Sequence, residues 1–190
     1  MNIAEEKIVN ATITCIEKYG INKTTIRQIA KEAGVNSAAI SYYFRSKDIL
    51  MKHAMDIALH NAFDLGNFKA SEGLSIKDRL VVILDGMIVG ALQFPNITKA
   101  FFYELMQNNG YDIPMVKGCN QFIAELEREI KETYPDMMRL DIGMLLIQLT
   151  SSTFLFLGLF PGFYTTFPEI DISDAKVRRD YVEKLVIKLI

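Results

Sequence analysis

A short stretch near the N-terminus combines small side chains, hydroxyl groups and cations in an order suited to contacting a charged polymer. If residues 37–44 form a helix, its outward positions carry Ser37, Ala38, Ser41 and Tyr42, with Tyr43 at the flank. Small residues let the helix backbone approach base edges, and hydroxyl groups can hydrogen-bond to phosphates or bases. Arg45 and Lys47 follow, where cations can lie against a phosphate backbone. These residue types predict non-covalent recognition of a nucleic acid.

Two helices joined by a tight turn are needed to present that face. The first is predicted over residues 26–33, because apolar residues recur at i, i+3, i+4 and i+7 and two preceding threonines can cap its free N–H groups. Gly34 stands at the turn, where glycine adopts positive φ without a Cβ clash. The second helix then begins, with Ile40 and Phe44 facing the first. This predicts a helix-turn-helix that enters a DNA major groove; the alternative is a plain amphipathic hairpin with a solvated polar face.

The charge of the chain is distributed unevenly. The net charge is −2, but residues 1–52 hold eight Lys or Arg against five Asp or Glu, and the remaining residues hold thirteen against eighteen. A basic head on an acidic body is compatible with DNA contact through the head alone.

Cysteine usage and the N-terminal residues indicate a reducing compartment. Cys15 and Cys119 lie far apart and lack the spacing of metal ligands, so a disulfide framework is not expected. The first residues are polar and acidic, without the pattern of a secretory signal. We therefore expect a cytoplasmic protein.

Helices are predicted throughout, and no convincing alternating strand is found. Besides the two helices of the motif, they are expected at about residues 3–19, 46–67, 75–94, 98–108, 114–134 and 140–163, and from about 173 to the end. The last of these is predicted to align Val177, Tyr181, Leu185 and Leu189 along one side.

Residues 140–163 are mostly apolar and approach the length that spans a bilayer. Asp141, Gln148 and a run of hydroxyl residues interrupt them, and no basic flank fixes an orientation. A helix buried against protein is therefore favoured over a membrane span.

With these elements in place, the chain resembles the TetR family of bacterial transcription regulators. The residues that carry the resemblance are Lys7-Ile8, Ala11, Gly20, Thr24-Thr25-Ile26, Ile29-Ala30, Ala33-Gly34-Val35, Ile40, Tyr42-Tyr43-Phe44 and Ser46-Lys47. The resemblance implies an all-α fold of about nine helices. It would place a three-helix helix-turn-helix DNA-binding domain at residues 1–46 and a helical ligand-binding and dimerisation domain at residues 47–190.

The resemblance also implies which residues touch DNA, namely Thr25, Ser37, Ala38, Ser41, Tyr42, Tyr43 and Lys47. Thr25 would hold a phosphate at a helix N-terminus, and the tyrosines and Lys47 would fix the register on the duplex. Ser37 and Ala38 would approach bases. Ala38 replaces a common glycine and Ser41 a common tyrosine, which leaves a smaller reading face.

Dimerisation is expected from geometry as well as from the resemblance. One head reads only a few base pairs, whereas two heads about 34–36 Å apart read successive major-groove faces of an inverted repeat. The expected interface combines the apolar segment with the C-terminal helix, through Met144, Ile147, Ser151, Phe154, Gly158, Tyr181 and Leu185. The alternative is an internal core helix without a partner.

The resemblance further implies an internal pocket in which a small molecule changes the spacing of the heads and lowers DNA affinity. The expected lining is His60, Phe63, Met87, Tyr103, Met106, Phe122, Met144 and Gln148, although Met and Phe at helical spacing are also typical of plain core. An apolar or amphipathic ligand is expected, because the body has no dense cationic cluster for a polyanion. The expected function is a dimeric repressor released by its ligand; the alternative is a ligand-independent DNA-binding or architectural protein, or an activator.

An enzyme is not expected. The chain has no phosphate-binding glycine-rich loop and no arrangement of nucleophile, histidine and carboxylate. His53 and His60 lie two helical turns apart on one face, but no carboxylate or cysteine completes a metal site. We therefore predict no catalytic residue, no metal and no cofactor.

Overall fold

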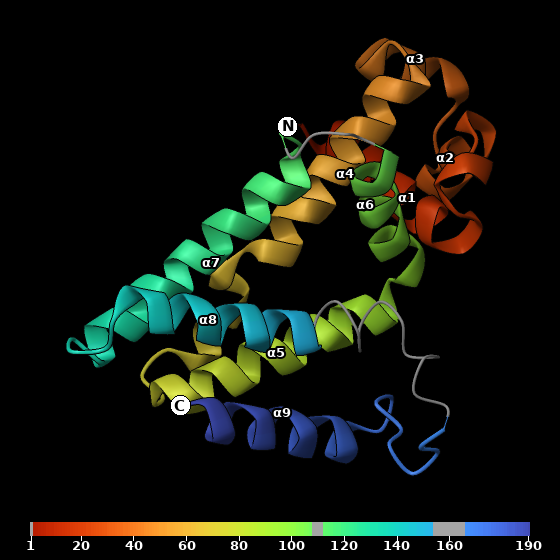
Figure 1. The fold of residues 1–190 in the computed structure, drawn as a ribbon. Coiled ribbons are helices and arrows are strands. Elements are labelled where there is room, and N and C mark those ends of the chain that lie inside the picture. The colour runs from red at the N-terminus through yellow and green to blue at the C-terminus, as the bar shows by residue number, and fades with distance from the viewer. Residues whose placement is uncertain (1, 108–111, 154–165) are drawn as a thin grey trace. The chain divides into compact units, whose positions relative to one another are not determined.

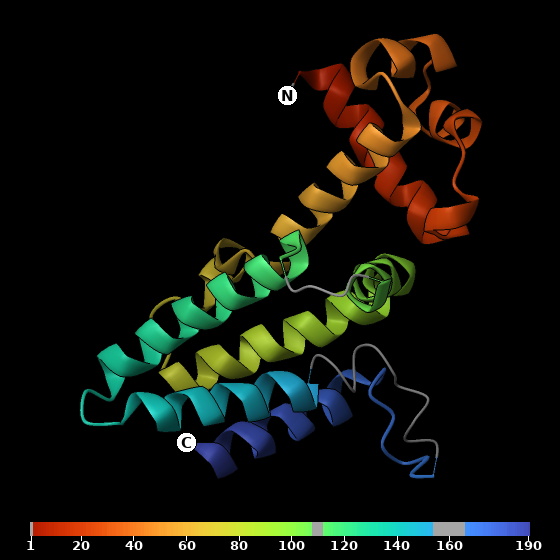
Figure 2. The same ribbon diagram turned by 45° about the horizontal axis from the view of Figure 1, so that its top comes forward.

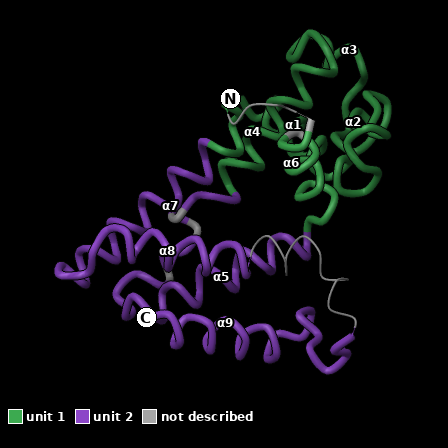
Figure 3. The backbone as a smooth tube through the Cα atoms, in the orientation of Figure 1, with its two compact units in different colours: residues 1–61, 94–116 green, residues 62–93, 117–190 purple. Residues whose placement is uncertain are grey.

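The computed structural model describes residues 2–107, 112–153 and 166–190, which contain nine α-helices, two short 3₁₀ segments and no strand (Figure 1). The predicted all-α fold is confirmed. The chain divides into two compact units, residues 1–61 with 94–116 and residues 62–93 with 117–190 (Figure 3). The predicted functional domains, residues 1–46 and 47–190, remain a prediction.

The first unit is built on α1 (Ile3–Tyr19), whose start is fixed by a reciprocal cap. Asn2 Oδ1 accepts the backbone N–H of Glu5 at 2.9 Å, and the Glu5 carboxylate accepts the backbone N–H of Asn2 at 2.9 Å. The helix packs on α2 (Ile26–Ala33). Core side chains of this unit that are at most 1% exposed include Ile8, Val9, Cys15, Ile16, Ile29 and Ile40.

The helix α4 (Lys47–Phe63) ends earlier than its predicted limit near Asn67. From Leu65 to Ser71 the chain forms 3₁₀ turns with a kink at Phe68, where φ is −106° and ψ is 23°. The Asp64 carboxylate accepts the Gly66 N–H at 2.8 Å. Such a short polar side chain offers the backbone a partner outside the helix, which accounts for the early stop.

The helix α6 (Pro95–Gln107) begins three residues before its predicted start near Thr98. Pro95 occupies its first position, where the missing N–H has no partner to lose and the fixed φ suits a helix. The same proline follows the end of α5 (Ile76–Gln93), as predicted. Within the first unit α6 packs beside α1.

The second unit contains α5, most of α7 (Pro114–Thr133), α8 (Arg139–Thr150) and α9 (Ala175–Leu189). In both ribbon views α9 lies alongside α5 (Figures 1 and 2). Fully buried side chains of this unit include Leu80, Leu84, Ile88, Phe122, Leu126, Ile130, Ile142, Leu149, Val182 and Val186.

Two arginines tie the helices of this unit together. Arg79 on α5 pairs with Glu129 on α7 at 2.6 Å and also donates to the Ser71 hydroxyl at 2.7 Å. Arg178 on α9 pairs with Asp85 on α5 at 2.6 Å. The hydrogen bond that Arg79 donates to Glu129 raises the pKa of Arg79, which opposes the effect of burial on the same guanidinium.

On α9 the buried residues are Arg178, Val182 and Val186. The four residues predicted to align along one side, Val177, Tyr181, Leu185 and Leu189, are half-buried beside them. The burial of a charged residue, Arg178, was not predicted.

In the predicted apolar segment of residues 140–163, the structure assigns an α-helix only to α8, and residues 154–163 lie outside the described residues. None of the described helices alone has both the length and the hydropathy for a membrane crossing. One bent pair, Ile76–Gln93 with Pro95–Tyr103, reaches these criteria when its two helices are taken together.

Candidate nucleic-acid interface

The turn of the predicted helix-turn-helix has the left-handed backbone conformation expected at Gly34. Gly34 has φ 64° and ψ 34°, in the left-handed region that a glycine enters without a Cβ clash. Its N–H donates to the Lys31 carbonyl at 3.2 Å, and the Val35 N–H donates to the Ala30 carbonyl at 2.9 Å. These bonds satisfy carbonyls at the end of α2 and direct the chain into α3 (Ser37–Phe44).

The helix α3 is held from behind and leaves its other face open. Asn36 Oδ1 accepts the Ala39 N–H at 2.8 Å and so caps the start of the helix. Ile40 and Phe44 are buried against the core, as predicted. The residues on the exposed face are Ser37, Ala38, Ser41 and Tyr42.

The two tyrosines of α3 support one another. Tyr42 is 81% exposed, whereas Tyr43 is half-buried. Their ring centroids lie 5.1 Å apart with the planes at 81°, an edge-to-face contact that favours one orientation of the exposed ring. The Tyr42 side chain is therefore exposed to solvent, and the contact with Tyr43 restricts the orientation of its ring.

Thr25 caps α2 in a reciprocal arrangement that the sequence did not predict. Gln28 Oε1 accepts both the backbone N–H and the hydroxyl of Thr25, each at 2.7 Å, and the Thr25 oxygen accepts the Gln28 N–H at 3.3 Å. The Thr25 hydroxyl hydrogen is thus directed at Gln28. The signal for this arrangement was a threonine followed three residues later by a glutamine.

The cations of this region differ in their surroundings. Lys18 on α1 pairs with Glu32 on α2 at 2.9 Å, and this hydrogen bond raises the pKa of Lys18. Arg45 is exposed and Lys47 half-buried, and within the described parts of the chain neither forms an ion pair. Their charges are therefore not neutralised by a neighbouring carboxylate, as contact with phosphates requires.

The residues predicted to line a ligand pocket are placed in different surroundings. Phe63 and Phe122 pack with ring centroids 5.8 Å apart, and Met87 is also buried. The other five predicted residues, His60, Tyr103, Met106, Met144 and Gln148, are exposed. The structure thus brings together only the two phenylalanines, and the predicted lining remains a prediction.

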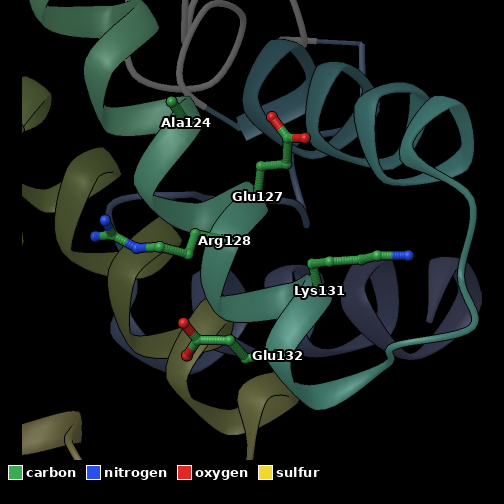
Figure 4. A pocket seen from close by; sticks show the side chains of 5 residues that line it. All are labelled: Ala124, Glu127, Arg128, Lys131 and Glu132. Atoms are coloured by element: carbon green, nitrogen blue, oxygen red, sulfur yellow. The ribbon is translucent and has the colours of Figure 1, made fainter.

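A hollow of about 370 Å³ lies on the outer side of α7, and Figure 4 shows its lining side chains extending from this one helix. The lining residues are Ala124, Glu127, Arg128, Lys131 and Glu132. Glu127 pairs with Arg139 at 2.6 Å, and Lys131 donates to the Pro135 and Met137 carbonyls at 2.6 and 2.7 Å. These charged groups fix the turn between α7 and α8, and none belongs to the predicted pocket.

Two of the predicted dimer residues, Met144 and Ile147, lie on an exposed side of α8 and are 49% and 65% exposed. Leu140 on the same side is 67% exposed, and the predicted Ser151, directly after the helix, is half-buried. On α9, Tyr181 and Leu185 are half-buried. The remaining two predicted residues, Phe154 and Gly158, lie outside the described residues.

Metal ligands are not gathered in the described parts of the chain, where no three His, Cys, Asp or Glu side chains are placed to hold an ion. His53 is exposed, and its ring centroid lies 6.0 Å from that of Phe44. His60 is exposed.

Comparison with known sequences identifies relatives of part of the chain. A sequence profile described as "Bacterial regulatory proteins, tetR family" matches residues 8–54. The HTH-type transcriptional regulator BetI of Stenotrophomonas maltophilia is 32% identical over 85 residues, which make up 44% of this chain and 43% of that protein. The chain therefore aligns with less than half of the length of this relative.

Comparison with solved structures extends over nearly the whole chain. The fatty acid degradation regulator FadR of Bacillus halodurans matches with a TM-score of 0.70 and 16% identity, over 98% of this chain and 96% of that one. FadR of Bacillus subtilis, solved in complex with stearoyl-CoA, matches with a TM-score of 0.68 and 16% identity, over 97% and 98%. At these identities the likeness shows the fold alone.

An open face on the second helix of a helix-turn-helix, in an all-helical chain, is the arrangement typical of DNA-binding proteins of the helix-turn-helix class. The profile match over residues 8–54 confirms the resemblance to the TetR family that the sequence predicted, in the part of the chain that contains the helix-turn-helix. The relatives are named transcriptional regulators, which agrees with the prediction that the chain is not an enzyme.

Proposed function

We propose that the chain is a homodimeric transcriptional repressor that reads an inverted-repeat operator in the cytoplasm and leaves it when a small molecule binds. The observation that carries the proposal is α3, which buries Ile40 and Phe44 and exposes Ser37, Ala38, Ser41 and Tyr42. Small and hydroxyl-bearing side chains on an open helix face suit the major groove. Residues 1–46 form the DNA-binding domain of this proposal, and residues 47–190 bind the ligand and the second subunit.

Dimer formation is supported by the exposed side of α8. Leu140, Met144 and Ile147 follow one another at steps of four and three residues, so they lie on one face of the helix. Contiguous exposed apolar side chains are costly in water and mark interaction surfaces. A second copy that covers them would pair two reading helices, as an inverted repeat requires.

The proposed effector is apolar or amphipathic. The unit that contains Phe63, Met87 and Phe122 is rich in apolar side chains that a flexible ligand can displace. The structural neighbour from Bacillus subtilis is described with stearoyl-CoA, and an acyl chain is a chemistry that such an interior would accept.

A mobility shift with the DNA upstream of the protein's own gene, titrated with salt, tests the proposal. We expect a discrete dimer-sized complex that weakens as salt rises and disappears in the double variant Tyr42→Ala/Lys47→Ala. If the double variant, shown to be folded by circular dichroism, binds as tightly as the wild type, α3 is not the reading helix. A subsequent ligand screen by calorimetry separates a ligand-released repressor from a constitutive DNA-binding protein.

A further inference from the structure

The backbone at Arg45, between α3 and α4, adopts a conformation that arginine rarely takes. Its φ is 59° and its ψ is −42°, and no other non-glycine residue in the described ranges has a positive φ. The Ser46 N–H donates to the Phe44 carbonyl, with 2.6 Å between nitrogen and oxygen, and closes a three-residue turn around Arg45. This turn is rare and strained for a residue with a Cβ, whereas glycine adopts positive φ without that penalty.

Anchors on both sides of Arg45 fix the turn. Before it, Phe44 is buried, and the Arg45 N–H still completes α3 by donating to the Ser41 carbonyl at 3.0 Å. After it, Leu50 is fully buried, and its N–H donates to the Ser46 carbonyl at 3.2 Å. Because both helices are held in the core so close to Arg45, this one residue must take up the change of direction.

The Arg45 side chain points to a reason for retaining arginine there. It is exposed, and its guanidinium makes no ion pair or hydrogen bond to any residue that the structure describes. It is the residue directly after the end of α3, next to the turn of the helix that exposes Ser41 and Tyr42. The fold requires the turn but not the arginine, because glycine would form the same turn without strain, and strained non-glycine residues are typical of binding positions.

We propose that Arg45 binds a phosphate of the DNA backbone at the edge of the reading face, and that the strained turn holds its guanidinium in place for this contact. A guanidinium can donate two parallel hydrogen bonds to one phosphate. If the backbone already holds the guanidinium in position, less conformational entropy is lost when these bonds form. The inference rests on the proposed DNA-binding function and adds a positioning role for a backbone conformation.

The test compares full-length wild type with Arg45→Ala, Arg45→Gly and Arg45→Lys. Two fluorescent duplexes are used, one selected from a random pool by the wild-type protein and one of unrelated sequence. A phosphate contact carries no sequence information, so we expect Arg45→Ala and Arg45→Gly to weaken binding to both duplexes by a similar factor, about ten-fold. The slope of log affinity against log salt should fall by about 0.9 for each phosphate lost, while Arg45→Lys keeps the slope.

Thermal melting tests the strain separately. Arg45→Gly should melt about 2–4 °C above Arg45→Ala, because only alanine keeps a Cβ at positive φ. Lys69→Ala is the matched control for loss of one exposed cation in the other unit, and it should leave both binding and slope unchanged.

Two results would overturn the inference while leaving the proposed function intact. One is that Arg45→Ala binds both duplexes like the wild type with the same salt slope. The other is that the alanine and glycine variants melt together, which would remove the strained turn from the explanation. If the wild type selects no duplex and binds neither, the proposed function itself is wrong, and this inference falls with it.

Discussion

Glu17 and Asn96, which are 79 residues apart in the chain, are joined by hydrogen bonds that involve the backbone and the side chain of each residue. The Glu17 carboxylate accepts the backbone N–H of Asn96 at 3.1 Å, and Asn96 Nδ2 donates to the Glu17 carbonyl at 2.7 Å. The same carboxylate accepts the Ile97 N–H at 3.1 Å. A carboxylate near the end of α1 thus caps the free N–H groups at the start of α6, where the helix dipole also favours negative charge.

Replacing Glu17 by alanine should lower the free energy of unfolding by about 1–3 kcal/mol. The loss arises because two backbone N–H groups at a partly buried helix end lose a charged acceptor. Urea denaturation followed by circular dichroism measures it. Glu132→Ala, at an exposed site on α7, is the control and should change little; equal stability of the two variants would mean that water replaces the cap without cost.

Removing Arg178 should be among the most damaging single changes in the second unit. Arg178→Met leaves the Asp85 carboxylate largely buried without its cation, which typically costs about 3–5 kcal/mol. The Ile172 carbonyl also loses the hydrogen bond that the guanidinium donates at 3.1 Å. Chemical denaturation of both variants compares this change with Arg179→Ala.

Arg179 provides the matched control for Arg178. It is the next residue on α9, it is exposed, and its ion pair with Glu183 lies on the surface at 3.0 Å. Exposed pairs contribute little, so Arg179→Ala should lower stability by at most about 1 kcal/mol. A similar loss in the two variants would show that Arg178 is solvated rather than buried in solution.

Local signals in the sequence predicted the helices well, and tertiary contacts explain the errors. The helix Ile3–Tyr19 was predicted at its observed bounds, since Gly20 marks its end. The burial of Arg178 on α9 was not predicted, because it depends on a pairing with Asp85, which is distant in sequence. A pairing that depends on a partner 93 residues away leaves no periodic signal.

The exposed face of α3 was also predictable, because it too depends on local signals. Its outward and inward residues depend on helix periodicity and on the turn at Gly34, both of which are local. The strained turn at Arg45 was not predictable, because it results from buried anchors on each side rather than from its own residue type. Composition alone does not distinguish pocket residues from core residues, since Met and Phe occur in both.

Gln28→Glu separates capping from DNA contact at the start of α2. Glutamate can accept the same N–H from Thr25, so the reciprocal cap and the melting temperature should be preserved. In the wild type, Gln28 Oε1 faces Thr25, and the donating Nε2 lies on the other branch of the amide. Replacing that donor by a carboxylate oxygen should weaken DNA binding about ten-fold if a phosphate lies nearby.

Asn10→Asp is the control for Gln28→Glu, because it makes the same amide-to-carboxylate change at an exposed site on α1. It accounts for the general effect of one added negative charge on binding. Anisotropy titrations at fixed salt should place Asn10→Asp near the wild type. If both variants weaken binding equally, Gln28 makes no local contact and serves only as a cap.

Placing a charge on the exposed side of α8 should prevent dimerisation without unfolding the protomer. Ile147→Glu places a carboxylate among side chains that a second copy would bury, and an unpaired charge in an apolar interface is strongly unfavourable. Because the residue is 65% exposed within one chain, the protomer itself has little reason to lose stability. Analytical ultracentrifugation should show a monomer for this variant and a dimer for the wild type.

Leu74→Glu makes a comparable change at an exposed apolar residue away from α8, before the start of α5. It should remain dimeric and bind DNA like the wild type. The Ile147→Glu monomer should lose the affinity gained by linking two reading helices, so its complex with an inverted repeat should be no tighter than with a single half-site. A dimer that survives Ile147→Glu would assign the contact to another surface and leave the exposed side of α8 without that role.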